Sequence, residues 1–492
     1  MKNRTQLFTH ATIITVDTSR TIWLDGALLV QGNRITALDK TAALLQHPAT
    51  PRDAQIVDCN GQIIIPGLIN THAHLAQSLL RGLAEDLPLH SWLCDAIWPL
   101  EAHYDADDGY VAARLTIAEM LRTGTTCFLE AMLTHRSGFE NVVRAVDEMG
   151  IRACLAKLVK GEETNQATGM IDARDRDISS MSLGAAVAAH QQYHGTQGGR
   201  LHVWIAAATP RGSPEEAHKA IGDASAAHGI NLTMHCAEAP DDRSIYRDMY
   251  NCSAAQFCER TNLISSAAAA EEDGGPTTKT RRTVLAHMVN LDLSTDLPIL
   301  ARTGAAVAHN PSSNCKLGSG IAAVPDMMHA GITVGLGTDG APCANTYDMI
   351  QEMRLAALLH RGQRRDAKAV VADDVLAMAT INGAKALGLD HDVGSLEIGK
   401  MADFVVLGTG GLHCAPFDGE QILEGGLDPV TAVVFSCTGA DVEKVVVDGQ
   451  VLVEGGRLVA CDETRIKRDA REAVRRVRTK AGVRASGGRK YC

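Results

Sequence analysis

The sequence lacks the features that mark exported and membrane-spanning proteins. Its first residues, MKNRTQLFTHATIITVD, contain no apolar core and no small-residue cleavage site. No apolar run approaches the roughly 18 residues that a membrane-spanning helix requires. None of its 13 cysteines forms a CxxC pair. We therefore expect a cytoplasmic protein with free thiols and no membrane partner.

A basic surface is also missing. The formal net charge is −11 over 492 residues, which argues against nucleic acid as a partner, because such proteins neutralise phosphates with a basic face. The exception is the C-terminal stretch RIKRDAREAVRRVRTKAGVRASGGRK, for which we expect a solvated helix and a frayed end. Apolar residues make up 45% of the chain and charged residues 21%, as in soluble globular proteins.

Strand-rich ends flank a different middle. Both ends contain short β-rich runs between Gly, Asn and Asp turns, which predicts one small β-sandwich assembled from the two termini. Strand-like and helix-like segments alternate between them, which predicts an α/β fold, a (β/α)8 barrel. The predicted boundaries are residues 1–66 and 395–455 for the sandwich, 67–394 for the barrel, and 456–492 for a C-terminal helix and basic tail. Two polar stretches, 161–177 and 265–282, are expected to be loops or insertions.

Polar residues stand where the apolar strands of the barrel end. His72 and His74 are two apart after an apolar run, so both imidazoles project to one face. Further strand ends carry His235, Glu238, His287 and Asp339. Charge or imidazole at a buried strand end is costly unless something binds it, and barrel enzymes place their catalytic residues there. Three imidazoles and a carboxylate suit Zn²⁺, or another borderline divalent ion, with a position left for water.

A competing motif lies in GLGTDG. Gly335, Gly337 and Gly340 match the GxGxxG pattern of dinucleotide-binding folds. No strand with an acidic end follows at about 20 residues, however, and Asp339 stands inside the turn. We therefore reject the nucleotide interpretation and expect the glycines to let the chain turn beside the ion.

The motifs PGLINTHAHL, HCAE, LAHMV, NPSSNCKLGSG, GLGTDGAP and GSLEIGKMADFVVL, in this order, resemble the amidohydrolase superfamily. They are similar to the branch of nucleoside and nucleobase deaminases and s-triazine hydrolases. The resemblance implies a small-molecule substrate, a homo-oligomer (dimer or tetramer) and one divalent metal ion, Zn²⁺ or alternatively Fe²⁺. It implies metal binding by His72, His74, His235 and Asp339, and catalytic roles for Glu238, His287 and Asp339.

Two other segments resemble enzymes of this branch that act on different substrates. LLRGLAEDLPLHSWLCDAIWPLEAHY is similar to methylthioadenosine/S-adenosylhomocysteine deaminases, which implies that Trp92 packs on the substrate and Glu101 binds ribose hydroxyls. Arg211, in TPRGSPE, replaces a histidine of those enzymes and is closer to guanine deaminases. It would hydrogen-bond a base carbonyl or ring nitrogens, or cap the following helix. His309, in AHNPSSN, would lie near the substrate on the barrel rim or hold the NPSSN turn.

These residues predict a hydrolytic deaminase that releases ammonia from an aminated purine or purine nucleoside of the adenosine, methylthioadenosine or S-adenosylhomocysteine type. Glu238 would protonate the ring nitrogen, His287 would direct the attacking water, and Asp339 would take its proton. The alternatives are a guanine, other oxopurine or pterin deaminase, or an s-triazine amino- or chlorohydrolase. A non-catalytic amidohydrolase-like assembly protein is a remote alternative, because such proteins lose ligands and this chain keeps the full set.

Overall fold

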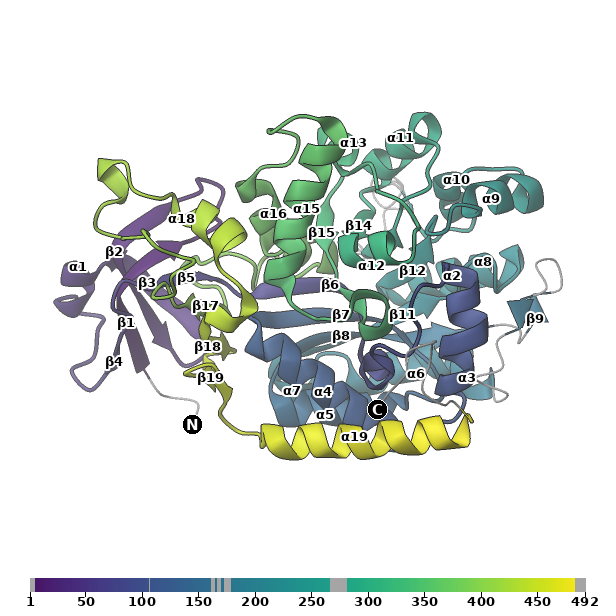
Figure 1. The fold of residues 1–492 in the computed structure, drawn as a ribbon, viewed down its shortest axis with the longest axis horizontal. Helices are drawn as coiled ribbons and strands as arrows, with labels where there is room; N and C mark the ends of the chain where they lie inside the picture. The colour runs from purple at the N-terminus through teal and green to yellow at the C-terminus, as the bar shows by residue number, and fades with distance from the viewer. Residues whose placement is uncertain are drawn as a thin grey trace, which may run out of the picture.

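The structure is a computed structural model that describes residues 5–105, 107–160, 164–165, 170–171, 178–265 and 281–482. Most of the two stretches expected to be loops, and the basic tail after residue 482, lie outside these residues. Figure 1 shows a β domain at the left, a barrel in the centre and at the right, and a long C-terminal helix along the lower edge.

A curled parallel sheet forms the barrel. Its strands are β6 (Leu68–His74), β7 (Thr125–Leu133), β8 (Arg152–Val159), β11 (Leu201–Ala207), β12 (Leu232–Cys236), β13 (Thr283–His287), β14 (Ala306–His309), β15 (Val334–Leu336) and β16 (Asp339–Gly340). From β6 to β15, each strand pairs in parallel with the next strand of the barrel along the chain, and β15 is thus paired with β14. The last strand, β16, pairs with the first, β6. Because β15 and β16 are two pieces of one interrupted strand, these pairings close the sheet. The expected (β/α)8 barrel is confirmed.

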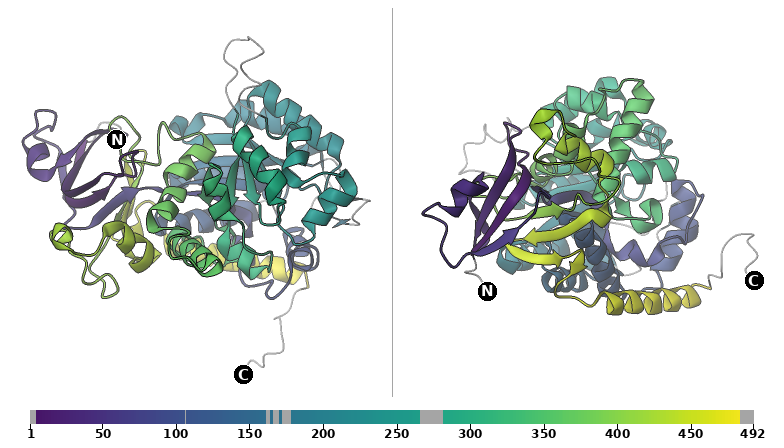
Figure 2. Two further views of the ribbon diagram at one scale, coloured as in Figure 1. Left: turned by 90° about the horizontal axis from the view of Figure 1, so that it is seen from above. Right: turned by 60° about the vertical axis from the view of Figure 1, so that its left-hand side comes forward.

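Helices cover the outside of the barrel, as Figure 2 shows from above. They are α4 (Asp108–Arg122), α5 (Phe139–Met149), α6 (Leu183–Tyr193), α8 (Glu215–His228), α9 (Asp242–Tyr250), α10 (Ala254–Arg260), α11 (Leu293–Thr303), α12 (Pro311–Lys316), α13 (Val324–His329), α15 (Met349–Arg364), α16 (Ala372–Met378) and α17 (Ile381–Leu387). Every residue of β6 and β13 is buried, since both faces of a barrel strand are covered. Polar side chains on these strands are therefore the unusual feature.

Both ends of the chain build the β domain. Its sheet contains β1 (Thr5–Ile14), β2 (Ile22–Gln31), β3 (Arg34–Lys40), β4 (Gln55–Asp58), β5 (Ile63–Pro66), β17 (Phe404–Leu407), β18 (Val442–Val447), β19 (Gln450–Glu454) and β20 (Arg457–Leu458). The two halves meet where β5 pairs antiparallel with β17. Side chains from both halves share one apolar cluster, in which the rings of Phe8 and Phe404 meet edge to face with centroids 4.9 Å apart. A composite β domain was expected from the sequence.

Helix α19 (Glu463–Lys480) lies along α4 (Figure 1). Four of its residues are buried at helical spacing: Ile466, Ala470, Ala473 and Val477. Three of them join the cluster that contains Trp92 and Leu100, so the helix supports the segment after β6. Its basic residues pair with acidic neighbours, as in Arg476 with Asp105. Within the described residues, no helix is both long and apolar enough to span a membrane.

Candidate metal centre and active site

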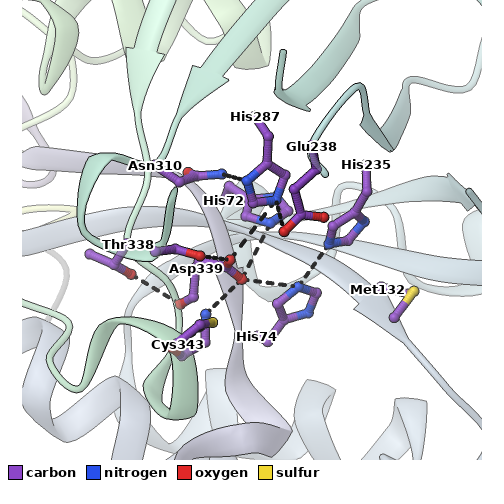
Figure 3. Close-up of polar contacts among 12 residues, drawn as sticks. His72, His74, Met132, His235, Glu238, His287, Asn310, Thr338, Asp339 and Cys343 are labelled. Carbon is purple, nitrogen blue, oxygen red and sulfur yellow. Dashed lines mark hydrogen bonds and ion pairs between the residues drawn. The ribbon is translucent and has the colours of Figure 1, made fainter. Parts of the chain in front are cut away.

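The polar residues predicted from strand ends meet at one end of the barrel (Figure 3). His72 and His74 project from β6, His235 from β12 and His287 from the last position of β13, while Asp339 begins β16. His287 and Asp339 have φ angles of 74° and 63°. This left-handed conformation is rare for residues with a side chain and persists where the surroundings enforce it, as at functional sites.

The donor atoms lie close together. The Nε2 atoms of His74 and His235 are 3.0 Å apart. Oδ1 of Asp339 lies 3.5 Å from Nε2 of His72 and 3.4 Å from Nε2 of His74. Nε2 of His287 stands 3.9 Å from Oδ2 of Asp339. One carboxylate thus faces three imidazoles, two from β6 and one from β13.

These residues fit a divalent metal ion. Nδ1 and Nε2 of His72 and Nε2 of His287 are buried and find no hydrogen-bond partner among the described residues, which is costly unless an ion uses them. The donor atoms of His72, His74 and His235 lie within 4.8 Å of one another, and so do those of His72, His287 and Asp339. Because His72 belongs to both groups, a single ion could draw on them together.

The pKa shifts of His72, His235 and Asp339 suit metal binding. Burial lowers the pKa of His72 to about 4 and that of His235 well below the usual value, so both imidazoles are neutral at pH 7, as metal ligands must be. Burial alone would raise the pKa of Asp339, but the neighbouring imidazoles of His72, His287 and His74 hold that pKa well below the usual range. Asp339 is therefore an anion.

Several supporting residues escape sequence reasoning. Glu130, on β7, lies 3.6 Å from Nδ1 of His74, and its carboxylate accepts from the backbone N–H of Leu75. Oγ of Ser313 donates to Oδ2 of Asp339 at 2.6 Å. Oδ1 of Asn314 lies 2.9 Å from Nδ1 of His287. Such contacts fix ring orientation and ligand basicity. Glu130 carried a usable signal, a carboxylate inside the apolar run TTCFLEAML, whereas the other two stand in a polar turn.

Glu238 stands beside the cluster, with Oε1 3.8 Å from Nε2 of His287. Burial raises the pKa of Glu238, which favours the protonated form. Its backbone N–H and that of Ala239 donate to Oδ2 of Asp242 at 2.7 and 3.0 Å. The other oxygen of Asp242 accepts from Arg211 at 2.5 Å, and Nη2 of Arg211 lies 3.8 Å from Oε2 of Glu238. Arg211 and Asp242 thus hold the segment that carries Glu238.

A cavity of about 870 Å³, measured to its open mouth, leads to these residues. Its polar lining includes His74, His235, Glu238, Asp339, Arg211 and Lys160. Its apolar lining includes Trp92, Trp98, Leu89, Leu93, Met132 and Leu158. Trp92 belongs to a π-helical stretch, Trp92–Ile97, in the segment between β6 and α4. A flat, mostly apolar solute with a few polar groups suits such a pocket.

Two predicted substrate-binding residues are not among the residues that line this cavity. Glu101 is buried at the end of a short helix, Trp98–Glu101. Burial alone would lower the pKa of His74, but the carboxylates of Glu130, Asp339 and, to a lesser degree, Glu101 raise it. His309 is fully buried on β14, with Nε2 3.1 Å from Nε2 of His360. His309 therefore lies behind the site. The sequence had left two alternatives for it, a contact with the substrate or a structural role in the NPSSN turn.

The glycines of GLGTDG serve close packing. None of the three has a positive φ angle. A Cβ atom at Gly337 would lie 2.4 Å from Oδ1 of Asn310 and 2.7 Å from Cβ of His72, and one at Gly335 would lie 2.6 Å from Thr71. These glycines were expected to permit a tight turn, but they instead let this strand approach β6 closely at Thr71 and His72.

A barrel that gathers histidines and an aspartate at its strand ends is typical of metal-dependent hydrolases. Residues 63–452 match the model of the amidohydrolase family, and the chain belongs to that family.

The chain is 34% identical over 452 residues to a 5-methylthioadenosine/S-adenosylhomocysteine deaminase of Desulforudis audaxviator, covering 92% of this chain and 95% of the relative. It is also 34% identical to a 5'-deoxyadenosine deaminase of Methanothermobacter thermautotrophicus, covering 89% and 91%. Among solved structures, an adenosine deaminase from Xanthomonas campestris with bound zinc has a TM-score of 0.83 and 25% identity, covering 96% and 98%. A triazine hydrolase from Arthrobacter aurescens has the same TM-score and identity, covering 96% and 99%.

Proposed function

We propose that this amidohydrolase is a zinc-dependent deaminase that releases ammonia from an adenine nucleoside of the adenosine, methylthioadenosine or S-adenosylhomocysteine type. The observation that carries the proposal is Glu238, a buried carboxyl with a raised pKa, beside the metal ligands and on the wall of the cavity. Aromatic deamination requires a proton donor for the ring nitrogen, and this residue can supply it. The deaminases among the similar proteins support the same chemistry.

A bound divalent ion would be held by His72, His74, His235 and Asp339, and it would supply a more acidic water as nucleophile at neutral pH. Glu238 gives a proton to the ring nitrogen next to the amine-bearing carbon. Asp339, an anion in a buried site, accepts the proton that the attacking water loses. Water adds to that carbon, and the amine leaves as ammonia with a proton returned through the same acidic pair.

His287 directs the water. Its Nδ1 is held by Asn314, so its Nε2 faces both carboxylates that exchange protons, Glu238 at 3.8 Å and Asp339 at 3.9 Å. Trp92, on the cavity wall, offers a flat apolar face to a purine. Glu101 stays a proposed ligand of the ribose hydroxyls, which requires the short helix that carries it to open toward the substrate.

Arg211 was the reason to consider a guanine or other oxopurine. Its Nη1 donates to Asp242 and its Nη2 faces Glu238, so the guanidinium is directed at carboxylates. This arrangement supports adenine over an oxopurine as the base. His309 is proposed as a positioning residue behind the site, and the triazine alternative is supported only by the likeness of fold.

An ammonia-release screen tests the proposal. The panel contains adenosine, methylthioadenosine, S-adenosylhomocysteine, guanine, cytosine, a pterin and an amino-triazine, each with and without chelator. We expect turnover of the adenine nucleosides, lost on chelation and restored by Zn²⁺. Turnover of guanine or the triazine alone would overturn the substrate class, and no turnover by metal-loaded protein would overturn the deaminase.

The identity of the metal, the oligomeric state and the location in the cell are also part of the proposal. The ion is Zn²⁺ rather than Fe²⁺, which elemental analysis of the purified protein decides. The chain forms a dimer or tetramer, which light scattering measures. The protein resides in the cytoplasm, which cell fractionation tests.

A further inference from the structure

A second group of metal-ligand side chains lies in the β domain, in the connection between β17 and β18. His413 and Cys414 follow β17, Cys437 directly follows the π-helical stretch Ala432–Ser436, and Asp441 directly precedes β18. Figure 1 shows this connection over the upper part of the β domain, with α18 (Pro429–Thr431) toward the barrel. None of these residues serves the deaminase chemistry above.

Three of these side chains lie close together, and the fourth, Cys437, contacts one of them. Nε2 of His413 lies 2.9 Å from Oδ2 of Asp441, and Sγ of Cys414 lies 3.8 Å from Sγ of Cys437. Donor atoms of His413, Cys414 and Asp441 all lie within 4.8 Å of one another. One imidazole, one carboxylate and one sulfur thus converge, and the sulfur of Cys437 lies beside that of Cys414.

The spacing of the sulfurs suits a tetrahedral ion. Two thiolates at about 2.3 Å from a tetrahedral zinc ion lie about 3.8 Å apart. This equals the separation of Cys414 and Cys437. The contact between His413 and Asp441 is shorter than a tetrahedral edge, because the two side chains now contact each other directly. Zinc would displace the thiol protons, and the imidazole and carboxylate would move apart around it.

The surrounding chain holds the donors in place. Oδ2 of Asp441 accepts from the backbone N–H and the hydroxyl of Thr438 at 2.8 and 2.9 Å, and its own carbonyl accepts from Gly408. A Cβ atom at Gly411 would lie 2.3 Å from Cε1 of His413, so the glycine makes room for the folded-back imidazole. Both sulfur-bearing residues are buried, whereas the imidazole is half exposed and offers an entry path.

We propose that His413, Cys414, Cys437 and Asp441 bind a structural zinc ion, separate from the catalytic one. The ion fastens the loop after β17 to the beginning of β18. A surface ion pair alone would account for His413 and Asp441, but it gives no role to two sulfurs held at zinc-ligand spacing beside it. Two sulfurs, one nitrogen and one oxygen form a set that favours Zn²⁺ over Mg²⁺ or Ca²⁺.

Cobalt substitution separates the two sites, because the catalytic ligands proposed above include no sulfur. The metal-free full-length chain is titrated with Co²⁺ alone, and the thiolate-to-cobalt charge-transfer absorption is recorded. The variants are Cys414→Ser and Cys437→Ser, with Cys59→Ser, another buried thiol of the β domain, as matched control. His413→Ala, at a half-exposed position, gives a variant that folds even if a buried substitution does not.

We expect the charge-transfer band in the wild type and in Cys59→Ser, and its loss in the two other serine variants. In His413→Ala we expect weaker binding, with the midpoint of the titration shifted to higher Co²⁺. Zinc content of the serine variants should fall by one equivalent while ammonia release is retained. A wild type without the band, or a band unchanged in Cys414→Ser, would overturn the proposal. So would a disulfide between Cys414 and Cys437 in protein purified with reductant.

Discussion

At the scale of single residues, the site depends on carboxylates kept in different protonation states by different surroundings. Asp339 faces imidazoles and stays an anion, whereas Glu238 is buried with fewer compensating contacts and has a raised pKa. When the surroundings give two neighbouring carboxyl groups different pKa values, one can act as an acid and the other as a base. The roles proposed for the two residues follow from that difference.

Replacing Glu238 with Gln removes the proton donor while keeping the side-chain shape. We expect kcat to fall by about 10²–10⁴-fold, the usual contribution of general acid–base catalysis. Zinc content should stay at the wild-type value, because Glu238 is not a proposed ligand. Kinetics and elemental analysis on the same preparation check both points. A variant that keeps more than roughly a tenth of the rate would show that the proton comes from elsewhere.

The raised pKa of Glu352 leads us to expect that the stability of the protein depends on pH. Burial raises the pKa of this carboxyl to about 8, although its oxygen accepts from the backbone N–H of Ser312. Between the unfolded value of about 4.3 and this folded value, only the folded chain keeps the proton, so the free energy of unfolding falls as pH rises. Replacing Glu352 with Gln removes that loss. The gain in Tm over wild type should therefore grow from about pH 5 to about pH 8.

The matched control is Glu443→Gln, a substitution at an exposed position of β18. Its Tm should follow the wild-type pH dependence throughout. A gain for Glu352→Gln that is equal at both ends of the pH range would mean that the Glu352 carboxyl does not hold a proton in the folded protein.

At the scale of elements, the turn between β12 and α9 determines where Glu238 points. Asp242, in the first turn of α9, accepts from two backbone N–H groups of this turn and from Arg211. Replacing Asp242 with Ala leaves the turn without its anchor, and displacement of a catalytic group by about 1 Å costs about 10²-fold in rate. We therefore expect kcat to fall by about that factor, with zinc content unchanged.

The neighbouring Asp241→Ala is the control, because that carboxylate is half exposed and lies 3.5 Å from His90. Its kcat should stay close to wild type. If both variants lost activity equally, the contacts of Asp242 with the turn would not be the cause.

Some features of the fold and the site can be predicted from the sequence, and others cannot. The barrel, the composite β domain and the positions of six polar residues at strand ends followed from apolar runs that end in polar residues. Asp348 caps α15, where it accepts from the backbone N–H of Ile350 and Gln351, a role that an aspartate directly before a helix-like segment can predict. Ser313 and Asp242 could not be found this way, because their roles depend on which loops meet in space. His309 was ambiguous for the same reason, since only the structure places it against His360.

At the scale of the whole molecule, a buried ion pair joins the barrel to the β domain. Arg152, at the beginning of β8, makes two contacts with Asp403, at 2.8 and 3.1 Å, and Asp403 also accepts from the backbone N–H of Asp448 at 2.7 Å. Burial alone would lower the pKa of Arg152, but Asp403 raises it above its usual value, so the pair stays charged. The two domains therefore meet through an ion pair in which neither partner can be removed alone without leaving a buried, uncompensated charge.

Replacing Asp403 with Asn leaves a guanidinium buried without its counter-charge. We expect the free energy of unfolding to fall by about 3–5 kcal/mol, seen as a lower urea midpoint. Adding Arg152→Met to that variant should recover part of the loss. The control is Arg144→Gln, which removes an exposed pair with Glu148 and should leave the midpoint unchanged. A midpoint unaffected by Asp403→Asn would mean that the two domains unfold independently of this pair.

The pairing of β5 with β17 has a consequence for synthesis on the ribosome. Strands β1 to β5 emerge first, and the edge that β17 will cover stays open while the whole barrel is translated. At about 5–20 residues per second, that interval lasts roughly 20–70 s. An open strand edge is a template for pairing with other chains. We therefore expect a chain terminated before residue 404 to aggregate instead of persisting as a smaller active enzyme.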